Sequence, residues 1–244
     1  MKGDDAMNEL TFEWIGDQGL LVRIGNRIAP EFHQRVKYVY EQLLKRKDLY
    51  IEELVPAYTT LAVYYDTTSI AKDKLSEEIT AIYQSRPKES SSQSREIVTI
   101  PACYGGDAAP DLNELAAYLN VSEQDVIDRH SSSEYLIYMM GFLPGFPYLG
   151  GMDARLATPR KATPRDKVPP GSIGIAGEQT GIYPIESPGG WNLIARTPIN
   201  LFDPSKKQPF PIEMGQYIRF EPISTEEFEA IRLQDDYALE VRKE

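Results

Sequence analysis

Five basic side chains gather in one short part of an otherwise acidic chain. They lie between residues 155 and 167, with Asp166 as the only acid among them: Arg155, Arg160, Lys161, Arg165 and Lys167. The guanidinium fork of arginine matches the oxygens of a carboxylate or a phosphate, and glycine-rich turns nearby can add backbone N–H groups as an anion-binding concavity. The stretch is therefore a candidate anion-binding loop. The alternative is a solvated basic loop with no ligand.

Other polar side chains are candidates for the same site. Three of them lie beside the closely spaced Gly177 and Gly181, where they either form the rim of a pocket or serve only as turn residues: Gln179, Thr180 and Tyr183. His130 ends a predicted helix and is a candidate catalytic acid or base. The alternative is a structural histidine whose protonated ring interacts favourably with the helix dipole.

The usual catalytic signatures are missing from the sequence. It contains neither the GxSxG pattern of a nucleophile elbow nor the GxxxxGK[ST] pattern of a P-loop. His33, His130 and the single Cys103 are too few for a typical structural zinc site, so no metal is expected. We therefore expect the chain to act with partner proteins rather than as a complete enzyme.

Composition excludes several classes of protein. The net charge of −11 opposes attraction to phosphate backbones, so nucleic-acid binding is not expected. No apolar run approaches the ~20 residues of a membrane-spanning helix, and the first ten residues, MKGDDAMNEL, lack the apolar core of a signal peptide. The single cysteine excludes an intramolecular disulfide. These features predict a cytoplasmic protein, with Met7 as a second candidate start.

The first third of the chain predicts a small α+β domain. Apolar alternation indicates strands at residues 10–15, 20–24, 51–55 and 60–65, and helical spacing follows Pro30 and Ser69. This ββαββα order defines a first domain at residues 1–88. The polar, serine-rich residues 86–95 form the predicted linker to a second domain at 95–244; the alternative is a surface loop within one domain.

The linker leads to a first testable prediction. We expect limited proteolysis to cut first within residues 86–95 and to leave two folded pieces, because this stretch is the most polar and least periodic between apolar segments. Mass spectrometry of the early fragments locates the cut. Early cleavage elsewhere, with this stretch intact, rejects the boundary.

Glycine and proline dominate the centre of the second domain. The fifty residues 141–190 contain ten of the 17 glycines and eight of the 18 prolines of the chain. Aromatic and β-branched residues run through the same stretch, which argues against disorder. Short strands joined by rigid turns are predicted, as in a β-barrel or a sandwich.

The same stretch resembles a known family. The motifs GFLPGFPYLGG, LATPRKATPR, GSIGIAGEQTGIYPIESPGGWNLIART and LFDP occur in order, preceded by IPACYGG, PDLNELA and HSSSEY, and further upstream by GDQGLLV and LVPAYTTLAVYYD. They resemble the family of the B subunit of 5-oxoprolinase, also called KipI-like or allophanate hydrolase subunit 1. The resemblance covers nearly the whole chain except its first few and last twenty or so residues. It implies a cyclophilin-like β-barrel for the second domain.

The resemblance also implies a function. Such a protein is one subunit of an ATP-dependent 5-oxoprolinase, which opens the lactam 5-oxo-L-proline to L-glutamate together with A-type and KipA-like C-type subunits. ATP is then used by the complex, and the two-protein module also resembles the carboxyltransferase region of urea carboxylase. One alternative is an inhibitor that binds a sporulation sensor histidine kinase. Prolyl isomerase activity is suggested only by the barrel, and a fold alone does not imply a function.

The site residues are candidates from the motifs and are not assigned by the family. Arg160 and Arg165 are expected to bind a substrate carboxylate or a phosphate at a subunit interface, with Gln179, Thr180 and Tyr183 beside them. Arg165 is expected to matter more than Arg160. His130 is the candidate catalytic residue.

Overall fold

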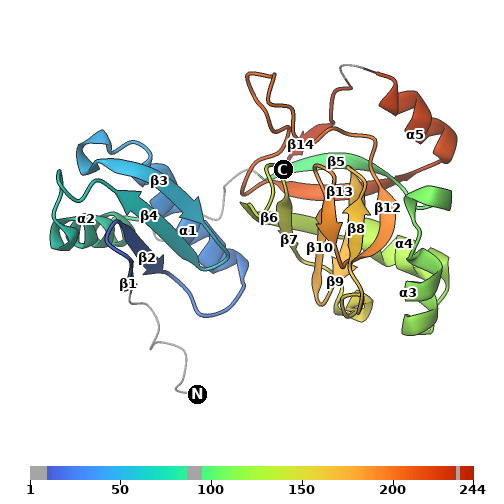
Figure 1. The fold of residues 1–244 in the computed structure, drawn as a ribbon, viewed down its shortest axis with the longest axis horizontal. Coiled ribbons are helices and arrows are strands. Elements are labelled where there is room, and N and C mark those ends of the chain that lie inside the picture. Colours follow the sequence, from blue (N-terminus) through green and yellow to red (C-terminus); the bar gives the residue numbers. More distant parts are fainter. Residues whose placement is uncertain (1–9, 87–94, 235–236) are drawn as a thin grey trace. The chain divides into compact units, whose positions relative to one another are not determined.

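The computed structural model describes residues 10–86, 95–234 and 237–244 (Figure 1). The chain divides into two compact units, residues 1–93 and 94–244, and each is described by itself. Most of the predicted linker, residues 87–94, lies outside the described residues. The exact domain boundary therefore stays a prediction.

The first unit is a four-stranded antiparallel sheet covered by two helices (Figure 1). Its strands, in the order β1-β2-β4-β3, are β1 (Thr11–Ile15), β2 (Gly19–Arg23), β4 (Thr60–Tyr65) and β3 (Ile51–Pro56). The helices are α1 (Pro30–Leu43) and α2 (Lys72–Gln84). Leu20, Val36 and Ile79, from a strand and both helices, belong to one buried core. The predicted ββαββα order is confirmed.

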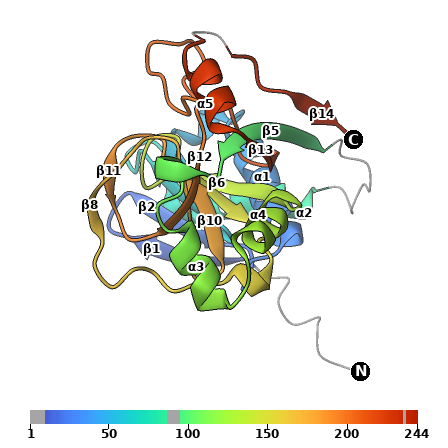
Figure 2. The ribbon, with the colours of Figure 1, turned by 90° about the vertical axis from the view of Figure 1, so that its right-hand side faces the viewer.

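The second unit contains a closed β-barrel of seven strands (Figures 1 and 2). The ring runs β5-β12-β9-β10-β7-β6-β13 and returns to β5. In that order the strands are β5 (Glu96–Cys103), β12 (Asn192–Arg196), β9 (Ser172–Ala176), β10 (Gln179–Ile182), β7 (Pro147–Gly150), β6 (Glu134–Met140) and β13 (Tyr217–Ile223). The short β14 (Val241–Lys243) adds to β5. The predicted barrel is therefore confirmed.

Three helices and a two-stranded ribbon surround the barrel. The helices are α3 (Leu112–Leu119), α4 (Glu123–Ser131) and α5 (Thr225–Arg232). The ribbon pairs β8 (Arg165–Val168) with β11 (Ser187–Gly189), and the sequence patterns did not predict it. None of the helices in the described ranges is long and apolar enough to cross a membrane.

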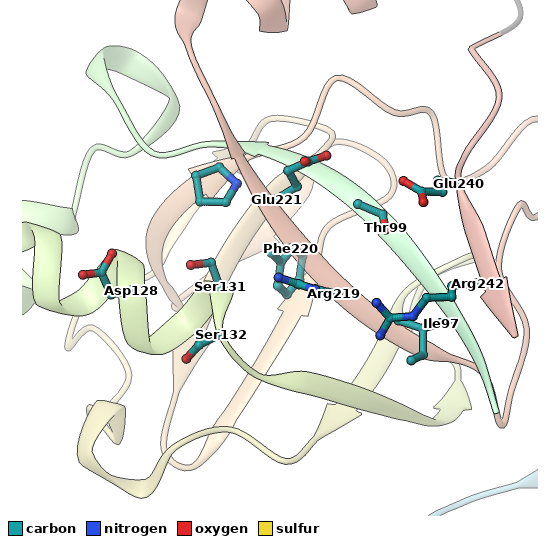
Figure 3. A pocket seen from close by; sticks show the side chains of 11 residues that line it. Ile97, Thr99, Asp128, Ser131, Ser132, Arg219, Phe220, Glu221, Glu240 and Arg242 are labelled. Carbon is teal, nitrogen blue, oxygen red and sulfur yellow. The ribbon is translucent and has the colours of Figure 1, made fainter. Parts of the chain in front are cut away.

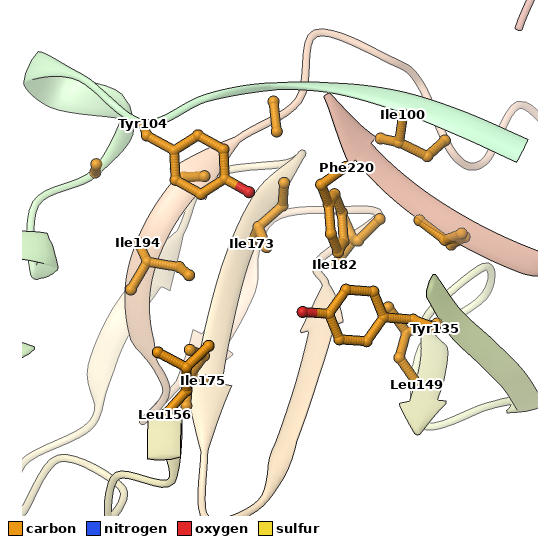
Figure 4. Close-up of a cluster of buried hydrophobic side chains, with 14 of the residues drawn as sticks. Ile100, Tyr104, Tyr135, Leu149, Leu156, Ile173, Ile175, Ile182, Ile194 and Phe220 are labelled. Carbon is orange, nitrogen blue, oxygen red and sulfur yellow. The ribbon is translucent and has the colours of Figure 1, made fainter. Parts of the chain in front are cut away.

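Alternating apolar residues fill the barrel interior (Figure 4). Ile173 and Ile175 on β9, Ile182 on β10 and Phe220 on β13 are buried in one cluster. Residues two apart on a strand face the same side, so each strand keeps its other face for the exterior. The exterior face of β10 at Gly181 packs against Phe146.

Side-chain caps fix several helix starts. The Ser122 hydroxyl accepts a hydrogen bond from the Asp125 N–H at 3.1 Å, in a reciprocal capping box at the start of α4. Ser224 and Glu227 form the same arrangement before α5. Helix α2 instead begins after Ala71 without a side-chain cap, and the Ser69 hydroxyl donates to Asp66 at 2.6 Å.

Candidate functional site

Tertiary hydrogen bonds hold the basic loop against the glycine-rich turns. Thr158 pairs with Gly177 in an isolated antiparallel bridge. The Lys161 N–H donates to the Gly190 carbonyl at 2.8 Å, and the side chain of Asn192 on β12 donates to the Pro159 carbonyl at 2.8 Å. The loop and these turns, separated in sequence, therefore form one surface.

Most of the basic side chains in this loop are neutralised by acids. Arg155 pairs with Asp153, and Lys167 pairs with Glu186 at 3.1 Å. Lys161 contacts both Asp111 at 3.0 Å and Glu114 at 2.8 Å. Much of the loop is thus a structural ion-pair network rather than an open cationic patch.

Asp111 is the centre of that network, and sequence reasoning missed it. Its carboxylate accepts from Lys161 Nζ at 3.0 Å, from Arg165 Nη2 at 2.6 Å and from the Leu193 N–H at 2.7 Å, while its side chain is 3% exposed. Burial alone would raise the pKa of Asp111, but the hydrogen bonds from Arg165, Leu193 and Lys161 outweigh it and lower the pKa below its ordinary value. An aspartate next to a helix start is by itself a signal only for a possible cap.

Arg160 and Arg165 differ in their surroundings. Arg165 is held by Asp111, and its Nη1 is buried with no hydrogen-bond partner in the described part of the chain. Arg160 is exposed, and its guanidinium makes no hydrogen bond or ion pair with any described residue. Arg160 is thus the basic loop residue left free to meet a ligand, in contrast to the expectation that Arg165 matters more.

Both arginines lie near a tyrosine that was predicted for the site. Burial raises the pKa of Tyr183, whereas a hydrogen bond from the backbone of Trp191 and the positive charges of Arg160 and Arg165 act in the opposite direction. Burial likewise raises the pKa of Tyr148, and Arg160 opposes that shift too. The Arg160 charge therefore acts on both phenol groups in the same direction.

The aromatic residues of the motifs form a small core separate from the barrel interior. Phe146 is 5.1 Å from Tyr148, 5.5 Å from Tyr183 and 5.6 Å from Trp191 between ring centroids, and it meets the rings of Tyr183 and Trp191 edge to face. The cluster packs outside β10, because a Cβ atom on Gly181 would lie 3.1 Å from the Phe146 ring. We call Phe142, Phe146, Tyr148, Tyr183 and Trp191 the aromatic platform.

Phe142 is the exposed end of this platform. Its side chain is 70% exposed, and its ring packs edge to face on Phe146 at 5.8 Å. Its φ of 67° lies in the left-handed region, which bulky residues rarely adopt. Such backbone strain of order 1–3 kcal/mol clusters at ligand and partner contacts, so Phe142 is a candidate contact residue.

The predicted polar residues on β10 point in two directions. Thr180 is fully buried, and its hydroxyl donates to the Gly174 carbonyl at 3.1 Å. Gln179, one residue earlier, is half-buried at the start of the strand. The structure therefore brings Arg160, Arg165 and Tyr183 together and directs Thr180 inward.

His130 also faces the interior. Its Nε2 lies 2.9 Å from the Thr180 hydroxyl, its Nδ1 lies 2.7 Å from the Tyr104 hydroxyl, and its ring stacks on Phe220 at 4.7 Å. Because Thr180 already donates to Gly174, the hydroxyl must accept from Nε2–H, so Nδ1 accepts from Tyr104. Both ring nitrogens are therefore engaged by buried hydroxyls.

The histidine ring is neutral. Burial lowers the pKa of His130 to about 3, because a charged imidazolium would lose its hydration. The interpretation of a protonated ring that stabilises the end of α4 is therefore wrong. The geometry favours a structural role, and the predicted catalytic role gains no support from it.

Two surface grooves of the second unit lie apart from these motif residues. One, of about 710 Å³, runs over β5 and β13 beside the end of α4 and is lined by Thr99, Ser131, Arg219 and Arg242 among others (Figure 3). Another, of about 470 Å³, is lined by residues between Pro198 and Val241. Neither contains a predicted site residue. In the described residues, no group of three histidine, cysteine or acidic side chains is arranged to hold a metal ion.

Residues 10–212 match the family model described as carboxyltransferase domain, subdomains C and D. The chain belongs to this family. It is similar to the B subunit of 5-oxoprolinase from Bacillus subtilis (strain 168), with 39% identity over 234 residues, 90% of this chain and 95% of that relative.

Solved structures agree with this assignment. The crystal structure of TTHA0988 superposes with a TM-score of 0.75 and 34% identity, over 85% of this chain but only 40% of that longer one. The K. lactis urea amidolyase gives a TM-score of 0.81 with 19% identity, over 100% of this chain and 17% of that protein. The second likeness shows the fold alone.

Proposed function

We propose that this chain is the B-type subunit of an ATP-dependent 5-oxoprolinase, which opens 5-oxo-L-proline to L-glutamate. The observation that carries the proposal is the 39% identity to the B subunit of 5-oxoprolinase along nearly the full length of both chains. A-type and KipA-like C-type subunits complete the enzyme. A role as one subunit also explains why this chain lacks the GxSxG and P-loop signatures of a complete enzyme.

The chemistry explains what the site has to supply. Ring opening adds water across the lactam amide: the carbonyl carbon gains oxygen, and the C–N bond breaks to leave a free amine. The amide is unreactive, so its oxygen must be activated, for example by phosphorylation from ATP, and the developing negative charge must be stabilised. A substrate carboxylate or a phosphate would meet the free guanidinium of Arg160, and the exposed side chain of Phe142 would cover the apolar face of the substrate ring.

We propose that Phe142, the exposed end of the aromatic platform, lines a site that is completed by the C-type subunit. The exposed, strained Phe142 and the unpaired Arg160 lie on outer surfaces, and neither of the two grooves described above contains them. A bulky exposed residue held at a positive φ fits a contact with a partner.

ATP is assigned to the complex rather than to this chain. The sequence has no P-loop, and ion pairs neutralise the other basic side chains of the loop, leaving Arg160 as its one free cation among the described residues. One arginine can contact a single phosphate but does not make a triphosphate site. The residues here therefore fit a transferred phosphate or a carboxylate better than whole ATP.

Reconstitution tests the proposed function. We expect the purified chain alone to hydrolyse neither ATP nor 5-oxoproline, and we expect glutamate to form only when the A-type and C-type subunits and ATP are all present. Glutamate and ADP are measured together, with each protein omitted in turn and with urea as a competing substrate. Robust glutamate formation by this chain alone, or urea-dependent turnover in its place, would contradict the proposal.

A further inference from the structure

One buried carboxylate joins three parts of the second unit. Asp111, just before α3, contacts Lys161 in the basic loop, Arg165 at the start of β8 and the backbone of Leu193 on β12. These partners are 50, 54 and 82 residues away along the chain. The two cations share the same carboxylate oxygen.

Tertiary contacts hold the two residues that flank Arg160. Pro159 is fixed through its carbonyl to Asn192, and Lys161 is fixed through its N–H to Gly190 and through its ammonium to Asp111. Arg160 is thus the free side chain between two tethered neighbours. Its backbone position depends in part on the Asp111 charge.

We infer that Asp111 is a positioning residue for the anion site, an inference that rests on the proposed function. It draws Lys161 and Arg165 away from the ligand surface and fixes the loop so that Arg160 meets the ligand carboxylate or phosphate. Asp111 does not touch the ligand. It acts through the loop that carries Arg160.

A purely stabilising role explains the network less well. Burying a charge is costly unless it is paired, and a buried ion pair is weak evidence for stability because apolar side chains of similar volume often serve as well. The arrangement also leaves Arg165 Nη1 buried without a partner in the described residues, which is unfavourable. The network does fix the position of the loop, and it keeps the charges of Lys161 and Arg165 paired with Asp111.

The test replaces Asp111 with asparagine in the assembled complex. Asparagine keeps the shape and an acceptor for the Leu193 N–H but loses the charge that holds Lys161 and Arg165. We expect KM for 5-oxoproline to rise about tenfold, since misplacing a binding group by about 1 Å weakens binding strongly, with kcat changed less than about twofold. Asp166→Asn is the matched control, because Asp166 is an exposed acid of the same loop with no ion pair to a described residue, and it should leave both constants unchanged.

A double-mutant cycle separates positioning from stability. In an Arg160→Gln background, Asp111→Asn should produce no further rise in KM, because the group it positions is gone. An equal rise in both backgrounds, or a fall in kcat that follows the loss of Tm, overturns the inference. If Asp111→Asn does not fold, Lys161→Gln removes the contact between the Lys161 ammonium and Asp111. This variant should also raise KM for 5-oxoproline.

Hydrogen exchange tests whether Asp111 fixes the loop, and it requires no activity measurement. In the purified chain, amide exchange within residues 159–165 should be at least about tenfold faster in Asp111→Asn than in wild type or Asp166→Asn. Unchanged exchange overturns the positioning role. A wild-type complex that lacks 5-oxoprolinase activity would refute the proposed function instead, and the exchange result would still stand.

Discussion

Replacing Arg160 with alanine in the assembled complex is expected to lower kcat/KM for 5-oxoproline by about 10- to 100-fold. Loss of a charge-assisted hydrogen bond costs roughly 1.5–3 kcal/mol, and about 1.4 kcal/mol corresponds to a factor of ten. The Tm of the isolated chain should not change, because Arg160 is exposed and makes no ion pair with a described residue. Steady-state kinetics of the complex checks the fall in kcat/KM, and thermal unfolding of the isolated chain checks the unchanged Tm.

Variants of neighbouring arginines are the controls. Arg155→Ala removes an exposed arginine that pairs with Asp153, and it should leave activity intact. Arg165→Ala should instead lower the Tm, because it removes a partner from the buried Asp111. Arg160→Lys should rescue poorly if the guanidinium binds through two parallel hydrogen bonds. Full activity in Arg160→Ala would show that the loop is only solvated, and lost assembly would place Arg160 in the contact between subunits.

Replacing His130 with alanine is expected to destabilise the second unit by about 3–5 kcal/mol, the range for large-to-small changes in a core. The ring is fully buried and stacks on Phe220, and its removal leaves the Tyr104 and Thr180 hydroxyls without their partner. Urea unfolding measures the change. A fall in the kcat of the complex with unchanged stability would instead support the predicted catalytic role.

The same histidine predicts sensitivity to acid. The unfolded state takes up a proton below about pH 6.5, whereas the folded state does so only near pH 3, so the unfolded state binds more protons in that window. Stability is therefore lost as pH falls, by at most about 1.4 kcal/mol per pH unit, with no contribution above pH 6.5. Urea unfolding of wild type and His130→Gln between pH 7 and 4.5 isolates the effect. Equal slopes in both proteins would contradict it.

Local patterns predicted the elements of the fold but not the network at its centre. The capping boxes at Ser122 and Ser224 and the alternation of the strands are short-range signals, so they could be read directly. Asp111 and Arg165 are 54 residues apart and meet only because the barrel closes. No local pattern indicates such a pair.

His130 is a different case, because a local signal existed. Val126 lies four residues earlier on the same face of α4, and both side chains are buried. That spacing indicates a core position for the histidine. The partners that keep its ring neutral, Tyr104 and Thr180, come from distant segments and could not be read from the sequence.

The position of β13 in the ring has a consequence for biosynthesis. This strand lies between β5 and β6, and it pairs in parallel with β5 over residues 217–223. At ~5–20 residues per second, the ribosome takes roughly 5–25 s to proceed from the end of β5 to the start of β13. During that interval β5 and β6 each lack the neighbour that later covers one edge, and unpaired strand edges promote association between chains. The nascent protein therefore passes through an aggregation-prone stage that ends only when β13 has left the ribosome.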